Sequence, residues 1–132
     1  MPQIDLNSPD GAQKIADILE RRTTDLMRMA TIEFYRQITI STPVDTGRAR
    51  EGWDISINAP SAKLPPEGNY TYHAGVPDVP AVTITDKYYI TNNVPYIGRL
   101  NNGYSRQAPA RFVELAAARI QAAIRKLWRR IK

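Results

Sequence analysis

The hydrophobic pattern of the first forty residues predicts a long helix. Apolar side chains recur there at roughly helical spacing. They are Ile15, Ile18, Leu19, Leu26, Met29, Ala30 and Ile38. Ser8, followed by Pro9, is one candidate N-cap of this helix, and Asp10 is another. Pro43 disfavours helical geometry at the residue before it, so we expect the helix to end near Ser41.

This predicted helix is longer than a small core requires. Arg22 and Glu33 interrupt its apolar stripe, so the pattern is not a clean coiled-coil heptad. About 30 residues at ~1.5 Å each give a length of ~45 Å. We therefore expect the free end of the helix to be solvated or to contact another subunit.

A period-two pattern predicts strands in the middle of the chain. Trp53, Ile55 and Ile57 alternate with polar residues, which is typical of a half-buried strand over 53–58. The sequence predicts two further strands, over residues 81–85 and 88–91. A tight turn at Asp86 and Lys87 joins them. Segment 94–100 is too short for its pattern to distinguish a helix from a strand.

Residues 59–80 form a proline-rich segment between these strands. It contains five prolines and two glycines, which exclude a helix or a central strand. The prolines are Pro60, Pro65, Pro66, Pro77 and Pro80. We expect an extended arm or hairpin that becomes ordered on a partner, with Tyr70 and Tyr72 as contact residues.

The C-terminal segment predicts an amphipathic helix at about 108–131, with Pro109 near its start. Its apolar positions alternate with a basic set that comprises Arg119, Arg125, Lys126, Arg129 and Arg130. The element order of helix, strands and helix favours a single α+β domain over residues 1–132. In this fold an antiparallel or mixed β-sheet packs with the long N-terminal helix and the amphipathic C-terminal helix.

Composition narrows the chemistry that the chain can perform. The 132 residues include no cysteine and one histidine, so a thiolate site is excluded and a zinc site is not expected. We also expect no cofactor. No apolar run reaches the ~20 residues that span a bilayer, and the N-terminal residues lack a signal-peptide pattern. We therefore expect neither export nor membrane residence.

Charge is concentrated at the C-terminal end of the chain. Residues 106–132 hold eight basic side chains and one acidic one, whereas the rest of the chain is slightly acidic. A basic helix can meet DNA phosphates, an acidic partner or only solvent. The five cations of the C-terminal helix are therefore candidate phosphate or acidic-partner contacts. A basic nucleic-acid-binding protein remains one alternative function.

Two motifs invite a catalytic interpretation that the surrounding sequence does not support. The triplet Asp45, Thr46 and Gly47 occurs in aspartic proteases, but a protease needs a second carboxylate to share the proton. Arg48 and Arg50 follow the triplet and would hold Asp45 ionised. We therefore interpret residues 45–48 as a structural turn, in which Asp45 caps backbone N–H groups and, with Arg48, fixes the chain after the long helix. His73 has no nearby nucleophile, and we do not expect an enzyme.

Three segments together resemble a family of phage proteins. They are Ser41-Thr42-Pro43-Val44-Asp45-Thr46-Gly47-Arg48 with Trp53, Ile90-Thr91-Asn92-Asn93-Val94-Pro95-Tyr96 with Leu100, and Gly103-Tyr104-Ser105-Arg106-Gln107-Ala108-Pro109. In order and spacing these segments are similar to tail-completion, or neck, proteins of long-tailed bacteriophages. The group is akin to lambda-type minor tail protein Z and to putative tail components of lambdoid phages. Asn101 departs from the family pattern, because the family often has an acidic residue there.

The resemblance implies a structural virion protein of the phage neck with no catalytic residues. Such proteins form closed rings, commonly sixfold, that join the DNA-filled head to the tail. A tail terminator ring that caps the tail tube is the nearest alternative. The expected partners are other copies of the chain, other neck, connector and tail-tube proteins, and the DNA that passes through the channel. The expected location is the virion neck or tail end, and the host cytoplasm during assembly. The candidate inter-subunit or partner contacts are Tyr70, Tyr72, Asn92, Asn93, Tyr96, Tyr104, Gln107 and Pro109.

Overall fold

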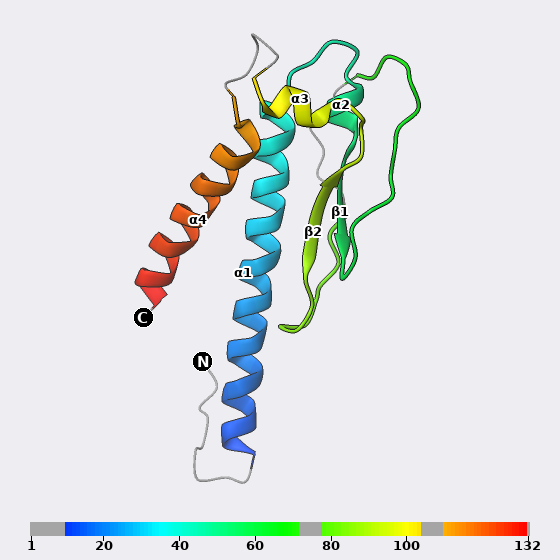
Figure 1. Cartoon of the computed structure of the whole chain (residues 1–132). Coiled ribbons are helices and arrows are strands. Elements are labelled where there is room, and N and C mark those ends of the chain that lie inside the picture. The colour runs from blue at the N-terminus through cyan, green and yellow to red at the C-terminus, as the bar shows by residue number, and fades with distance from the viewer. Residues whose placement is uncertain (1–9, 72–77, 104–109, 132) are drawn as a thin grey trace.

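One long helix, α1 (Gly11–Ser41), organises the whole structure (Figure 1). In this computed structural model, residues 10–71, 78–103 and 110–131 are described. The other elements are α2 (Arg48–Glu51), β1 (Trp53–Ile57), β2 (Tyr88–Asn92), α3 (Ile97–Asn101) and α4 (Phe112–Ile131). α4 packs on one side of α1 and the sheet lies on the other, while the N-terminal half of α1 extends beyond both (Figure 1). The predicted α+β fold is confirmed.

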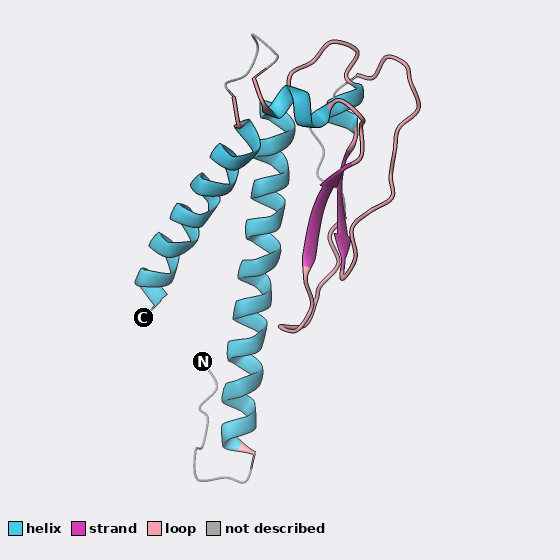
Figure 2. Ribbon diagram, viewed as in Figure 1, coloured by secondary structure: helices cyan, strands magenta, loops and turns pink. Residues whose placement is uncertain are grey.

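The sheet is a two-stranded antiparallel ribbon (Figure 2). β1 pairs with β2 so that Trp53 lies opposite Asn92 and Ile55 opposite Ile90. Because side chains alternate along a strand, the apolar residues of β1 share the face that packs against α1. The period-two pattern thus predicted β1 correctly, and it placed β2 within one residue of its end.

The predicted strand at 81–85 is wrong, because these residues form a loop and a turn. The Thr83 N–H donates to Asp86 Oδ2 at 2.8 Å, and the Asp86 N–H donates back to the Thr83 carbonyl at 3.1 Å. These bonds bend the chain where a strand would have to continue. β-Branched residues favour a strand only where a neighbouring strand offers a ladder, and here β2 pairs with β1 instead.

Asn58 closes the 30-residue connection between the two strands. Its backbone N–H donates to the Lys87 carbonyl at 2.8 Å, and its side-chain oxygen accepts the Lys87 N–H at 2.9 Å. Its side-chain amide also donates to Asp86 at 2.8 Å, which lowers the pKa of that exposed carboxyl. Asn58 has a φ of 64°, a left-handed conformation that asparagine tolerates better than most residues.

The core lies where four segments meet near the C-terminal end of α1. Its buried centre comprises Ile38 of α1, Trp53 of β1 and Phe112 of α4. Ile97 and Leu100 of α3 pack against this centre, so the ambiguous segment 94–100 ends as helix. Val113 and Ile120 of α4 share an apolar groove with residues of α1 and β2. No helix in the described part of the chain is long and apolar enough to cross a bilayer.

A buried hydrogen bond joins the end of α1 to the sheet. Trp53 Nε1 donates to Thr42 Oγ1 at 2.8 Å, and that hydroxyl donates in turn to the Ile38 carbonyl at 2.7 Å. Thr42 is only 1% exposed. Arg50 donates to the carbonyls of Ile40 and Thr42, which are among the carbonyls that a helix end leaves unpaired. These bonds fix the first residue of β1 relative to the last turn of α1.

We predict that Thr42→Val lowers the free energy of unfolding by about 1–3 kcal/mol, because it leaves the buried Trp53 N–H without an acceptor. The measurement is denaturant unfolding followed by tryptophan fluorescence. Thr39→Val is the matched control, because the Thr39 hydroxyl donates only to the Tyr35 carbonyl of its own helix. Equal losses for the two variants would contradict the prediction.

Candidate functional site

The turn after α1 is shaped by a glycine that no other residue replaces without strain. Gly47 has a φ of 86°, and a Cβ placed there would lie 2.5 Å from the Tyr70 carbonyl oxygen. The Tyr70 N–H donates to the Thr46 carbonyl at 2.7 Å, which draws the proline-rich segment against the turn. Close backbone approach and positive φ therefore both require glycine at this position.

The side chains of Arg48 and Thr46 also hold the turn through hydrogen bonds. Arg48 Nε donates to the Pro65 carbonyl at 3.0 Å, and the Arg48 N–H donates to Thr46 Oγ1 at 3.3 Å. The Asp45 carboxylate is exposed and has no hydrogen-bond partner among the described residues. The capping role predicted for Asp45 is therefore supplied by Thr46. Arg48 joins the turn to the proline-rich segment, and its role in fixing the chain after the long helix stays a prediction.

The proline-rich segment is irregular over residues 59–71, as predicted, and it hydrogen-bonds to its own domain. Its ordering on a partner stays a prediction. Pro65 is buried, and the Tyr70 hydroxyl donates to the Pro66 carbonyl at 2.5 Å. The Ser61 hydroxyl donates to Asp54 of β1 at 2.6 Å. The anchors that reach further along the chain, from Arg48 to Pro65 and from Tyr70 to Thr46, were invisible in the sequence.

Two asparagines predicted as partner contacts act inside the chain. The Asn92 amide donates to the Ala49 carbonyl at 2.7 Å, and its oxygen accepts the Val94 N–H at 3.0 Å. The Asn93 amide donates to the carbonyls of Ser61 and Lys63. These amide groups join β2 to α2 and to the proline-rich segment, and the role of the two residues as partner contacts stays a prediction. The predicted contacts Tyr72, Tyr104, Gln107 and Pro109, as well as His73, lie outside the described residues.

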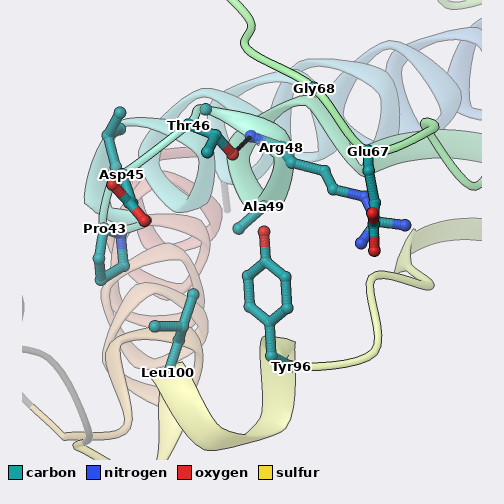
Figure 3. Close-up of a pocket in the computed structure, with 11 residues that line it drawn as sticks. Pro43, Asp45, Thr46, Arg48, Ala49, Glu67, Gly68, Tyr96 and Leu100 are labelled. Atoms are coloured by element: carbon teal, nitrogen blue, oxygen red, sulfur yellow. Dashed lines mark hydrogen bonds between the residues drawn. The ribbon is translucent and has the colours of Figure 1, made fainter.

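These contacts leave a pocket of about 540 Å³, which we call the turn pocket (Figure 3). It is lined by Pro43, Val44, Asp45, Thr46, Gly47, Arg48, Ala49, Glu67, Gly68, Tyr96 and Leu100. Tyr96 points from the start of α3 toward Ala49, and Arg48 extends along the opposite wall toward Glu67 (Figure 3). The Tyr96 hydroxyl has no hydrogen-bond partner among the described residues. The lining of the turn pocket therefore combines apolar side chains, such as Leu100, with charged ones, such as Asp45 and Arg48.

The polar groups of the turn pocket differ in how they are engaged. Its Thr46 hydroxyl is bonded by the Arg48 backbone, and none of its lining residues is a histidine. Over residues 10–71, 78–103 and 110–131, no group of three or more metal-ligating side chains comes together. Arg48, Asp45 and Glu67 bring charge of both signs to the rim.

The basic residues of α4 form a separate exposed surface. All five predicted cations are exposed, and none of them pairs with an acidic side chain in the described residues. They are Arg119, Arg125, Lys126, Arg129 and Arg130. The structure does not bring them to the turn pocket, which is formed by other elements.

Asn101 is a structural residue whose role the sequence did not reveal. Its side-chain oxygen accepts the Val113 N–H at 3.0 Å, which caps the first turn of α4. Its amide donates to Glu114 at 2.9 and 3.0 Å, and its carbonyl accepts the Arg111 N–H. The amide bond is the main cause that lowers the pKa of Glu114 below its ordinary value of 4.5. The only sequence signal was that Asn101 lies in a turn-forming segment, two residues before Gly103. That position did not indicate a helix cap, because α4 starts eleven residues after Asn101.

Comparison of the chain with models of protein families, with characterised proteins and with solved structures finds no match.

We predict that Gly47→Ala destabilises the protein by at least ~1–2 kcal/mol, because alanine resists the left-handed conformation and its Cβ meets the Tyr70 carbonyl. Hydrogen exchange should accelerate at the Tyr70 amide, which donates across the turn. Gly98→Ala is the control, since a Cβ there has open space and lies in a helix. Unchanged exchange at Tyr70 in Gly47→Ala would show that the turn does not anchor the segment.

We predict that the Asn101–Glu114 contact stabilises the protein only while Glu114 is ionised. The folded-state pKa is lowered, so this contribution is present above the unfolded-state pKa and is lost as the pH falls through the folded value. Denaturant unfolding from pH 7 down to pH 3 should show a shallower acid decline for Asn101→Ala than for the wild type. Glu114→Gln should flatten the decline similarly, and an unchanged slope in both variants would contradict the prediction.

Proposed function

We propose that this chain is a structural protein of the neck of a long-tailed phage. Copies of it form a ring, sixfold to match the tail, which joins the DNA-filled head to the tail. The protein acts in the virion and is assembled in the host cytoplasm. The proposal rests on the resemblance of three short segments and on the spatial arrangement of the two that the structure describes.

The convergence of two distant segments is the observation that carries this proposal. Residues 41–48 and 90–96 are separated by the whole of β1 and the proline-rich segment. Thr42 of the first segment accepts the Trp53 hydrogen bond, and Tyr96 and Leu100 close the turn pocket against residues 43–49. Residues that resemble one family and meet at one site support a shared role for that site.

The turn pocket supplies a surface that a ring requires. A ring is built from heterologous contacts, in which a surface of one copy fits a different surface of the next. The turn pocket is concave, and its walls are fixed by Gly47, Arg48 and Asn92 through hydrogen bonds within the chain. We propose that a segment of a neighbouring copy or of an adjacent neck protein occupies it, with Tyr96 as a contact residue.

A contact with nucleic acid is a second candidate, which the exposed cations of α4 favour. Five basic side chains without described acidic partners attract phosphates wherever DNA passes within about one Debye length, ~8 Å at physiological salt. Within the neck proposal, this surface would face DNA in the channel. As a separate function, it would make the chain a basic nucleic-acid-binding protein.

We predict that disrupting the gene in a phage that carries it yields filled heads and separate tails of normal length. Electron microscopy of the lysate measures this, and the wild-type gene supplied in trans should restore joined particles. Tyr96→Ala should restore few joined particles while the purified variant keeps its unfolding midpoint. Gly98→Ala, whose added Cβ has open space, should restore them fully.

The other outcomes separate the alternatives. Tails of uncontrolled length would identify a tail terminator, because a missing cap leaves tube polymerisation unchecked. Normal virions that lack the chain would contradict both structural roles. A small particle that shifts DNA at moderate salt would favour the nucleic-acid-binding function.

A further inference from the structure

A stripe of side chains runs along α1 on the side away from the buried core. Five of its eight residues are exposed, and Ile15, Leu26 and Glu33 are half-buried. Its positions alternate in steps of four and three residues, which is the spacing of a coiled-coil seam. We call it the α1 stripe, and it consists of Ile15, Leu19, Arg22, Leu26, Met29, Glu33, Arg36 and Ile40. Leu19, Met29 and Ile40 are 59%, 65% and 56% exposed. By contrast Ile38, outside the stripe, is 1% exposed in the core.

The positions of the α1 stripe are symmetric about one point of the helix, which determines how two copies can pair. Reversing the stripe about the midpoint between residues 27 and 28 returns the same eight positions. Two copies of α1 that run antiparallel about this point therefore bring every stripe residue opposite a stripe residue of the other copy. Ile15 then lies opposite Ile40, and Leu26 opposite Met29.

The charges of the α1 stripe are complementary in this arrangement. Arg22 of one copy lies opposite Glu33 of the other, and the pair occurs twice by symmetry. Within its own chain, Glu33 accepts bonds from Arg36 and Gln37 through Oε1 alone. Glu33 Oε2 is therefore left for a second donor. The Arg22 guanidinium has no hydrogen bond or ion pair with the described residues, so it is available as that donor.

The remaining pair also fits this arrangement. Leu19 lies opposite Arg36, whose head is held by Glu33 of its own helix at 2.9 Å. The aliphatic stem of such an arginine can cover an apolar neighbour while the charge stays in water. No position of the stripe is left with an apolar side chain opposite an uncompensated charge.

Other arrangements of two copies are disfavoured by the same residues. In a parallel pair in register, Arg22 would face Arg22, and Glu33 would face Glu33. Like charges in such contacts repel and suppress that arrangement. An antiparallel pair shifted to a midpoint at residue 24 would set Arg22 against Leu26 and Glu33 against Ile15.

We propose that the α1 stripe is a self-association site, at which two copies of this chain pair through antiparallel α1 helices centred between residues 27 and 28. The contact is isologous and joins two copies with twofold symmetry. It is distinct from the ring contact, because a ring requires heterologous surfaces and no stripe residue lines the turn pocket. The proposal does not rest on the neck function.

The first test measures the mass of the purified full-length protein by analytical ultracentrifugation over a dilution series. We expect a reversible dimer of the 14.9 kDa chain. Arg22→Glu and Glu33→Arg should each raise the dissociation constant of the dimer by about tenfold or more. The double variant should recover most of this loss, because the two charges are exchanged across the interface.

The matched control is Glu20→Arg, which reverses a charge on the opposite face of α1. It should leave the dissociation constant of the dimer near the wild-type value. Circular dichroism of each variant checks that the helices remain. A wild-type protein that stays monomeric at its highest soluble concentration would overturn the proposal. Single and double variants with the same dissociation constant would overturn it as well.

The second test fixes the direction and the register of the pair. The chain has no cysteine, so introduced thiols report only the designed contact. Mixing Ile15→Cys protein with Ile40→Cys protein under mild oxidation should give a disulfide-linked heterodimer, and neither variant alone should crosslink efficiently. Self-crosslinking of Ile15→Cys alone would indicate a parallel pair and overturn the proposed geometry. A phage assay plays no part in either test, so their failure is distinguishable from failure of the neck proposal.

Discussion

The buried hydrogen bond between Trp53 and Thr42 is the contact on which the arrangement of the other elements depends. It fixes the start of β1 beneath the last turn of α1, and Arg50 holds the carbonyls of that turn from the other side. β1 then sets the position of β2 through the ladder, and β2 sets the position of Asn92 and Val94. The turn pocket is formed by segments at both ends of this chain of contacts. The contacts that determine the shape of the turn pocket therefore lie in the core, although the pocket itself lies at the surface.

In this fold, side-chain amides of asparagine join segments that longer helices or strands would hold together in other folds. Asn58 joins the ends of the strand connection, Asn92 joins the sheet to α2, and Asn101 caps α4. Each amide both donates and accepts. Asn92 bonds backbone groups of two separate segments, whereas Asn58 and Asn101 each bond one backbone N–H and one carboxylate. A two-stranded sheet alone is only marginally stable. These cross-links, together with the packing on α1, hold it in place.

Periodicity predicted the elements whose partners are local and failed where the partner is distant. α1 and β1 could be located from spacing alone, and α4 from its amphipathic pattern, because apolar faces repeat within each segment. The predicted strand at 81–85 was wrong, because β-branched residues favour the strand conformation but do not show whether a neighbouring strand is available for pairing. Asn92 and Asn93 were interpreted as surface contacts, although their amides bind carbonyls thirty or more residues away along the chain. The importance of the turn at Gly47 was predicted, but its partner Tyr70 was not.

The clamp at Asn58 has a consequence for how this fold tolerates change. Because residues 58 and 87 are bound to each other directly, the strand ladder does not sense the length of chain between them. Closing a flexible loop costs only about 0.6 kcal/mol more for each doubling of its length. A longer connection between residues 58 and 87 should therefore leave the strand ladder intact, which opens this connection to evolutionary variation or to the grafting of a foreign peptide.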